Sequence, residues 1–355
     1  MRKGDIIGGY YILQDFIVAG GMSKISFAKR GDTEYFIKEF LAPKYPVAGA
    51  PGSPVSIARK QKRCDEFEAH HKKLNDAIGH KCSFGGNLVY AVDFFRAETA
   101  YYKVTEKIDI ASLSTKDISK LPLEKILIIL KTVTHSLKIL HDLKIVHGDL
   151  KPDNILIKQT KTGAYTTKLI DFDNSYFSEE PPENKEEVVG TPEYYSPELA
   201  TYIKKGETDE DRKTLTIQSD IFALGIIFTE YLTGEKPKIL SKYNYSWEAI
   251  NDNSDIHLNG GGRTTKLREL LLVMLQKDKN KRPTITEVFN TLKHSDIIKD
   301  VIEESHKIEP EIHITTKPKL KISSNLQSAM GKDDKKIETP KDKSGGLRIK
   351  GLNTD

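Results

Sequence analysis

The sequence is poor in the residues that build cysteine-based frameworks. Cys64 and Cys82 are the only cysteines in 355 residues. Two are too few for a disulfide framework or a cysteine-based zinc site. A reducing compartment is therefore the default, and we expect the protein in the cytoplasm.

Long apolar runs are also missing. The longest, residues 126–130 and 221–228, are too short to cross a bilayer. The first ten residues contain no apolar core of a signal peptide. We expect a soluble protein without a membrane span, unless a partner recruits it to a surface.

Charge of one sign is not in large excess. Lys and Arg number 55 and Asp and Glu 51, which gives a net charge of +4. Much of this excess lies in the tail, and the rest of the chain lacks the clustered basic face of a nucleic-acid-binding protein. We expect no nucleic-acid partner.

The N-terminal part of the chain contains short runs rich in β-branched and aromatic residues. Glycine-containing turns at 20–21 and 31–32 separate the first three runs. Residues 42–55 are rich in Pro, Gly and Ala and indicate a loop, which a charged helix at 57–77 follows. The expected strands are residues 10–18, 25–30, 34–40, 88–95 and 99–106.

After residue 106 the pattern becomes helical. A stripe of apolar residues at helical spacing predicts an amphipathic helix at 122–142. Residues 217–233 are apolar nearly all round and predict a buried helix, and two further helices are expected at 266–276 and 284–292. The stripe comprises Leu123, Ile126, Leu127, Leu130, Val133, Leu137 and Leu140.

From about residue 301 Lys, Glu, Ser, Thr and Pro dominate, and we predict a disordered basic tail. It holds Thr339-Pro340 among lysines, and its end alternates apolar and basic residues. Docking of a partner and a linker without a role are both open interpretations of this segment.

Two segments carry the chemistry of phosphoryl transfer. Residues 147–154 read His-Gly-Asp-Leu-Lys-Pro-Asp-Asn, and Leu-Ile-Asp-Phe-Asp follows at 169–173. Asp149 would accept the proton of an attacking hydroxyl, and Lys151 would offset the charge of the transferred phosphoryl group. Asn154 and Asp171 would hold Mg²⁺, with Mn²⁺ as the alternative ion. His147 is expected to brace the loop rather than act as a base.

The strand-rich part is expected to hold ATP. Gly20 and Gly21 lie in a loop of small residues where backbone N–H groups can approach phosphate. Lys38, bracketed by apolar residues, would bind the α and β phosphates. Its anionic partner on the following helix is expected to be Glu68, with Glu66 as the alternative.

The segment Tyr-Lys-Val-Thr-Glu-Lys-Ile at 102–108 joins the two parts. Its backbone, from Thr105 and Glu106 to Ile108, could meet an adenine edge, and Thr105 would border the deep pocket. A plain linker predicts the same residues nearly as well.

A long-range pattern extends further along the chain. Gly-Thr-Pro-Glu-Tyr-Tyr-Ser-Pro-Glu at 190–198 contains Thr191 and Glu198. Asp220 begins the predicted buried helix, and Arg282 lies in a later loop. We expect Glu198 and Arg282 to form a buried ion pair, in which loss of one partner costs about 3–5 kcal/mol.

From about residue 8 to residue 294 the chain resembles a eukaryotic-like (Hanks-type) serine/threonine protein kinase, with a phosphate loop similar to that of bacterial members. The resemblance implies an α+β, bilobal fold with a small β-rich N-terminal lobe containing one helix and a larger, mainly helical C-terminal lobe. The implied parts are an ATP-binding lobe at 1–105, a catalytic and substrate-binding lobe at 106–300 and the tail at 301–355.

The resemblance also implies a reaction and its residues. It implies ATP- and Mg²⁺-dependent phosphorylation of Ser/Thr hydroxyls on protein substrates, including autophosphorylation. The implied catalytic pair is Asp149 and Lys151, the metal ligands are Asn154 and Asp171, and Thr191 is typical of members directed at Ser and Thr. The ATP-binding set is Val18, Gly20, Gly21, Ser23, Ile25, Lys38, Glu68, Thr105, Glu106 and Ile108. His147, Thr191, Glu198, Asp220 and Arg282 are expected to support the loop and the substrate platform.

The sequence departs from the pattern in four ways. Gly148 stands where many kinases carry an arginine that receives a phosphate on the activation segment, and residues 179–187 are already acidic. We therefore expect activity without phosphorylation of this segment. Asp173 replaces the Gly of Asp-Phe-Gly, either as a turn residue tolerant of left-handed backbone or as a further carboxylate near the metal. Val18 and Ser23 occupy the outer glycine positions of the phosphate loop, and Ser196 replaces an alanine.

Two other functions are compatible with parts of the pattern. His-Gly-Asp-Leu with Ile-Asp-Phe-Asp is also similar to aminoglycoside and choline kinases, although Lys151-Pro152, residues 190–198 and Arg282 are not expected there. The third interpretation is a pseudokinase that acts as a scaffold. The presence of every residue that phosphoryl transfer requires argues against it. A bacterial cytosolic protein and a translocated effector would look alike in this sequence.

Overall fold

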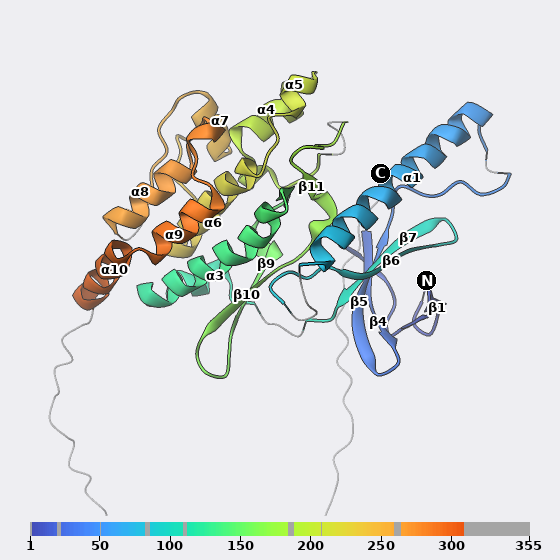
Figure 1. The fold of residues 1–355 in the computed structure, drawn as a ribbon, viewed down its shortest axis with the longest axis horizontal. Helices are drawn as coiled ribbons and strands as arrows, with labels where there is room; N and C mark the ends of the chain where they lie inside the picture. The colour runs from blue at the N-terminus through green and yellow to red at the C-terminus, as the bar shows by residue number, and fades with distance from the viewer. Residues whose placement is uncertain are drawn as a thin grey trace, which may run out of the picture. The chain divides into compact units, whose positions relative to one another are not determined.

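The computed structural model divides the chain into one compact unit that reaches residue 309 and a second unit at 310–355. Figure 1 shows a sheet with one long helix in the N-terminal part and a group of helices in the C-terminal part of the first unit. Side chains are described as far as residue 304. The structure describes residues 2–19, 23–49, 51–81, 86–108, 112–183, 188–206, 208–258 and 264–308.

The described residues of the N-terminal lobe form an antiparallel sheet of seven strands in the order β1-β2-β4-β5-β7-β6, with β3 also paired to β4. Its longest pairing joins β4 and β5 across a tight turn in which Gly31 has a φ of 61°. The strands are β1 (Ile6–Ile7), β2 (Tyr10–Ile12), β3 (Ile17–Ala19), β4 (Ser23–Arg30), β5 (Thr33–Phe40), β6 (Ala91–Ala97) and β7 (Ala100–Glu106).

The predicted strand at 10–18 is divided into β2 and β3. Ile12 pairs with Ala28 and Ile17 with Ile25, so five steps along the first segment face three steps along β4. The two extra residues leave the ladder, and the Ser26 hydroxyl donates to the Gln14 carbonyl at 2.7 Å. This irregularity bends the edge of the sheet where the predicted phosphate loop begins.

Helix α1 (Pro54–Gly79) extends the predicted helix at both ends. Ser53 caps its N-terminus by accepting from the Ser56 backbone N–H at 3.2 Å, and Pro54 fits the first helical position. The helix turns one side toward the sheet, where the buried residues are Cys64, His71, Leu74 and Ile78.

The C-terminal lobe is built around two predicted helices, and both predictions are confirmed. Every residue of the predicted stripe is buried in α3 (Leu123–Asp142), and α6 (Gln218–Thr233) is buried almost throughout. Around them lie α2 (Thr115–Ile118), α4 (Pro197–Lys205), α5 (Asp209–Arg212), α7 (Ser246–Asn251), α8 (Thr265–Met274), α9 (Ile285–Lys293) and α10 (Ser295–Ile308).

Short strands carry the two segments that are predicted to be catalytic, between these helices. β8 (Ile145–Val146) pairs with β11 (Tyr176–Phe177), and β9 (Ile155–Gln159) pairs with β10 (Tyr165–Leu169). The segments of chemical interest therefore leave neighbouring strand ends. The bilobal α+β fold expected from the sequence is confirmed, and in the part of the chain described here no helix has the length and apolar character that a membrane crossing needs.

The predicted boundary at residue 300 is wrong. Helix α10 continues to Ile308, and Val301 is only 1% exposed, because the apolar side of this helix packs against α3, α8 and α9. The lobe therefore includes residues assigned to the tail from their polar composition. Residues 309–355, with the predicted docking segment, lie outside the described residues.

Docking of α10 can be tested with two isoleucines on this helix. Ile297 is 3% exposed and Ile302 is 40% exposed. We expect Ile297→Ala to lower the free energy of unfolding by about 2–5 kcal/mol, because it empties a buried site. Ile302→Ala is the matched control and should cost under about 1 kcal/mol. Urea denaturation of the full chain measures both, and equal losses would contradict the packing.

Candidate active site

The predicted catalytic loop at 147–154, which follows β8, is anchored by the buried carboxylate of Asp220. Asp220, in the first turn of α6, accepts from the backbone N–H groups of His147 at 2.7 Å and Gly148 at 3.4 Å. It also lies 3.1 Å from Nε2 of His141. Asp220 is 3% exposed, so these bonds compensate a charge removed from water. The loop is thereby fixed to the most buried helix of the lobe.

His147 lies in a position that suits bracing. Its ring is fully buried, its Nε2 lies 3.2 Å from the Ile170 carbonyl, and it packs edge-on against Phe172. Burial lowers the pKa of His147. A neutral ring enclosed in this way can link the loop to the Asp-Phe-Asp segment, which agrees with the expected role.

The structure brings the two predicted catalytic residues together with Thr191. Lys151 Nζ lies 2.8 Å from Oδ2 of Asp149 and 2.9 Å from the Thr191 hydroxyl, which donates to Oδ1 of Asp149 at 2.8 Å. The three groups form a closed triangle of charge-assisted hydrogen bonds. Asp149 thus already accepts a hydroxyl donor, which is the interaction that a base for an alcohol requires.

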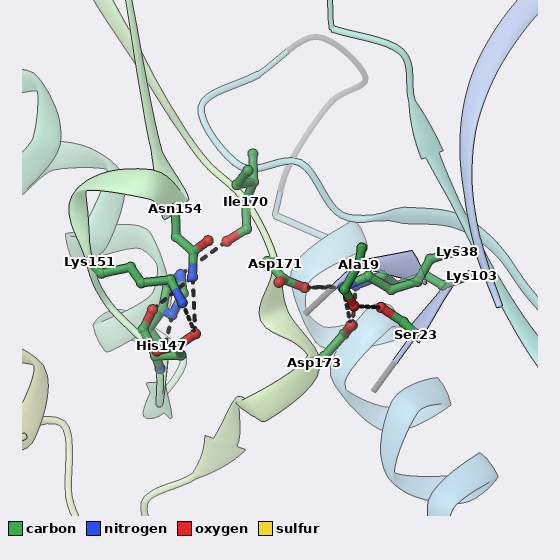
Figure 2. A network of polar contacts seen from close by, with 11 residues as sticks. Ala19, Ser23, Lys38, Lys103, His147, Lys151, Asn154, Ile170, Asp171 and Asp173 are labelled. Carbon is green, nitrogen blue, oxygen red and sulfur yellow. Dashed lines mark hydrogen bonds and ion pairs between the residues drawn. The ribbon is translucent and has the colours of Figure 1, made fainter. Parts of the chain in front are cut away.

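The predicted metal ligands are neighbours. The Ile170 backbone N–H donates to the Asn154 carbonyl at 3.1 Å, which places the start of β9 beside the Asp-Phe-Asp segment. Asn154 Nδ2 donates to the Asp149 carbonyl at 2.8 Å, so the orientation of its amide is fixed. In Figure 2 the Asn154 side chain lies between Lys151 and Asp171.

This donor set fits Mg²⁺ held jointly with phosphate. One carboxylate and one amide oxygen are few ligands, but Mg²⁺ commonly takes the rest from phosphate and water. The Asp171 side chain is 37% exposed and so remains open to the cleft. Within the described residues no cluster of three His, Cys, Asp or Glu side chains suits a metal that relies on protein ligands alone.

The expected Lys38–Glu68 pair is wrong for this structure. Lys38 Nζ lies 2.8 Å from Asp171 and 2.7 Å from Asp173, and among the described residues no hydrogen bond or ion pair joins Lys38 to α1. Glu68 pairs with Lys72 at 2.6 Å. The alternative, Glu66, lies 3.5 Å from Lys62 on the exposed side of the same helix.

The reason is the side of α1 that meets the sheet. His71, and not a carboxylate, is the buried polar residue there, while Glu68 lies at the margin, where its neighbour one turn on attracts it. Asp173 supplies the counter-charge instead. Asp173 is a turn residue, as one of the two interpretations had it, since it lies in the 3-10 turn Phe172–Asn174. The left-handed backbone belongs to Asp171, with a φ of 63°.

Only the flanks of the predicted phosphate loop are described. Gly20 and Gly21 lie outside the described residues. Val18 is 66% exposed, whereas Ser23 is buried and donates to the Ala19 carbonyl at 3.1 Å. Ile25 lies opposite Lys38 in the β4–β5 register, which places the loop and the lysine on adjacent strands. Phosphate binding by this loop stays a prediction.

The charged side chain of Glu106, in the segment that connects the two lobes, is already paired within the protein. Thr105 and Glu106 are buried, and Glu106 pairs with Lys168 of β10 at 2.6 Å. Ile108 is half-buried. Because the Glu106 carboxylate is engaged, only backbone groups remain for an adenine edge here, as expected from the sequence, and that contact also stays a prediction.

The predicted ion pair at the base of the lobe is confirmed. Arg282 donates from both terminal nitrogens to the two oxygens of Glu198, each at 2.7 Å, and its side chain is fully buried. The guanidinium also donates to the carbonyls of Gln218, Gln276 and Lys277. All its donors are thus directed at acceptors, which locks the end of the activation segment to the helical core.

Sequence reasoning missed Lys103. It lies on β7, 11% exposed, and donates to Asp173. The signal was available, because Lys103 stands between Tyr102 and Val104 in a strand, as Lys38 stands between Ile37 and Glu39. The same pattern, a lysine within a strand of mainly apolar residues, thus indicates a role for Lys103 as well as for Lys38.

Comparison with known proteins identifies the family of the chain. A family model described as "Protein kinase domain" matches residues 57–292. That span is more than half of the chain, so the chain belongs to the protein kinase domain family. The match begins in α1, and the strands before it are assigned by the fold.

The individual relatives are similar to this chain over part of their length. It is 25% identical over 297 residues to serine/threonine-protein kinase PknA of Corynebacterium glutamicum, which covers 79% of this chain and 55% of that protein. It is 31% identical over 173 residues to serine/threonine-protein kinase Pkn1 of Myxococcus xanthus, which covers 48% of this chain and 23% of that protein. The chain thus spans about half or less of the length of these relatives.

A solved structure shows the same fold. The autoinhibited serine kinase domain of the giant muscle protein titin matches with a TM-score of 0.57 at 17% identity, over 81% of each chain. At this identity the likeness concerns the fold alone.

Gly148 provides a test of the loop geometry. Its φ is 80°, and an added Cβ would lie 2.1 Å from the Asn174 carbonyl oxygen. Gly163 has a φ of 82°, yet its Cβ would meet nothing closer than 4.0 Å. We expect Gly163→Ala to cost only left-handed backbone strain, about 1–2 kcal/mol. Gly148→Ala should lower the free energy of unfolding clearly further, and equal losses in urea denaturation would contradict the close approach.

Proposed function

We propose that the chain is a protein serine/threonine kinase that transfers the γ-phosphoryl group of ATP to Ser and Thr hydroxyls of protein substrates, itself included. The observation that carries the proposal is the triangle of Asp149, Lys151 and Thr191, with contacts of 2.8–2.9 Å. A base, a cation and a threonine hydroxyl meet at one point of the catalytic loop.

The residues have distinct roles in this reaction. Asp149 accepts the proton of the substrate hydroxyl as the oxygen attacks phosphorus, in the position where it now accepts from Thr191. Lys151 donates to the transferred phosphoryl oxygens and offsets their charge. Lys38 donates to the α and β phosphates from its place on β5. These roles require alignment and charge stabilisation and no covalent intermediate on the protein.

Asn154 and Asp171 would hold Mg²⁺, or Mn²⁺, between the two lobes. The ion supplies positive charge to the phosphate oxygens when it is bound. Asp171 is suited to this place because one of its oxygens accepts from Lys38 while its side chain stays partly exposed. A compartment that supplies ATP is required, and we place the reaction in the cytoplasm.

Protein substrates are favoured over small molecules by the platform below the triangle. Thr191 belongs to the segment that ends at Glu198, and the Glu198–Arg282 pair fixes that segment to α6 and the loop before α9. Such a supported surface beside the base suits an extended polypeptide. The named relatives are likewise protein kinases.

We further propose that activity does not require phosphorylation of the activation segment. Residues 179–190 contain no Ser, Thr or Tyr. Carboxylate and backbone groups already make ordering contacts there, because Glu180 pairs with Lys73 of α1 at 2.5 Å and the Pro181 carbonyl accepts from Arg212 at 2.9 Å. The close approach at Gly148 leaves no room for a phosphate-receiving arginine in this loop conformation.

Asp149→Asn tests the base. With Mg²⁺–ATP and a generic basic protein as substrate, we expect phosphorylation to fall by about 10²–10⁴-fold, because the amide cannot take the proton. Asp142→Asn on the exposed end of α3 is the matched control and should leave the rate unchanged. Transfer to an aminoglycoside or to choline and not to protein would favour the small-molecule alternative. Absence of any turnover by the unaltered chain would favour the scaffold.

Phosphatase treatment tests the second part of the proposal. The chain is treated with phosphatase, the phosphatase is removed, and the initial rate is measured before new phosphate accumulates. We expect the initial rate to be unchanged, since the segment contacts are made by unmodified groups. Mass spectrometry confirms removal of phosphate. A rate that is lost and returns only after incubation with ATP would refute the idea.

A further inference from the structure

Two lysines face each other across adjacent strands in the N-terminal lobe. Lys38 of β5 and Lys103 of β7 are directly paired in the strand register. Their side chains are 13% and 11% exposed. Like charges directly opposite each other in a sheet are destabilising, and more so away from water. Such a pair requires a counter-charge between the two ammonium groups.

Asp173 provides that counter-charge. Its Oδ2 accepts from Lys38 at 2.7 Å and its Oδ1 accepts from Lys103, with the side chain 15% exposed. Asp171 lies 2.8 Å from Lys38 and 3.7 Å from Lys103. Two lysines and two aspartates thus form a neutral group of four within the described residues (Figure 2). Both oxygens of Asp173 are engaged by lysines, so this carboxylate does not turn toward the metal site.

The pKa values follow the same geometry. Burial alone lowers the pKa of Lys38, but the neighbouring carboxylates of Asp173 and Asp171 outweigh it and raise the pKa. Burial raises the pKa of Asp173, and Lys103 and Lys38 outweigh that effect and lower it. Lys38 and Asp173 are therefore both expected to be charged at neutral pH.

Helix α1 contributes no charge to this group. His71 is the buried residue on its facing side, and burial lowers the pKa of His71 to about 3, so its ring is neutral. Glu68 is held by Lys72. The helix contacts the activation segment instead, where His70 Nε2 lies 2.9 Å from the Ser175 carbonyl and Lys73 pairs with Glu180.

We propose that Asp173, bridged to Lys103, is the positioning residue for the ATP-binding Lys38, and that no carboxylate of α1 has this role. The inference rests on the proposed function, because Lys38 is there the phosphate ligand. Asp173 retains Lys38 through an oxygen that the metal does not need. Asp171 can then turn its open side to the metal without releasing the lysine from its strand.

The charge arithmetic distinguishes this role from packing. Asp173→Asn leaves two lysines with the single carboxylate of Asp171, an excess of one positive charge. Lys103→Met in the same chain removes that excess and leaves one Lys38–Asp171 pair. The second substitution should therefore be stabilising in the Asp173→Asn chain and destabilising in the unaltered chain. A residue that only fills space would give additive losses.

The experiment uses the full chain with Asp173→Asn, Lys103→Met, the two together, and Glu68→Gln. Thermal unfolding without nucleotide measures the coupling, and calorimetric titration with Mg²⁺–ATP measures affinity. We expect Asp173→Asn to weaken ATP binding at least about tenfold, as loss of a buried charge partner predicts. Glu68→Gln should bind as the unaltered chain does, and the double variant should melt above Asp173→Asn.

Several outcomes would overturn the inference. They are additive losses in melting temperature, unchanged ATP affinity in Asp173→Asn, or a larger loss of affinity in Glu68→Gln. If Asp173→Asn does not fold, the double variant replaces it, and affinity equal to that of Lys103→Met would contradict positioning by Asp173. The proposed function fails separately, because a chain that binds ATP without transferring phosphate refutes the kinase activity and leaves the affinity comparison intact.

Discussion

The attachment of the catalytic loop to α6 through Asp220 is the constraint from which the rest of the site follows. One buried carboxylate receives two successive backbone N–H groups, of His147 and Gly148. With the backbone fixed there, Asp149 is presented to Lys151 and Thr191, and the ring of His147 reaches the Ile170 carbonyl. Without this anchor, a loop containing a left-handed glycine would have many accessible conformations.

A second set of contacts joins the two lobes by charge and by backbone. Lys38 of the sheet reaches the Asp-Phe-Asp segment, and Glu106 at the end of β7 reaches Lys168 of β10. Leu88 forms a parallel bridge with Leu169 close by. Lys38 is therefore attached to the C-terminal lobe directly, and α1 is attached to the activation segment through His70 and Lys73. The two attachments are separate in this structure.

The parts of the fold that the sequence predicted are those determined locally. The stripe of α3 and the all-round apolar α6 follow from periodicity, and the motif residues around Asp149 and Asp171 lie on strand ends that pairing brings together. The limits of β2 and β3 were not predictable, because they depend on register with β4. The extent of α10 was not predicted, because its polar side dominates its composition, while Ile297, Val301 and the partly buried Ile298 pack against the core.

The prediction of the partner of Lys38 was wrong for a different reason. The sequence of a charged helix does not show which of its carboxylates faces the sheet, because that depends on the rotation of the helix about its axis. In α1 this rotation turns His71 inward. Lys103 and Asp173 lie 70 residues apart, so their contact becomes visible only when β7 and the Asp-Phe-Asp segment are placed together. Resemblance to a family favoured the usual partner and gave no reason to look for this one.

The close approach of Gly148 to Asn174 also limits what this loop could become. A side chain at position 148 would collide with a backbone oxygen, which no rotamer change can move aside. An arginine introduced at position 148 would disrupt the conformation of the loop before any phosphate was available for it to bind. Gating by phosphate is thus not one substitution away from this sequence. The turn at 172–174 would have to be rebuilt beforehand, so the close approach opposes a gradual replacement of Gly148 by arginine.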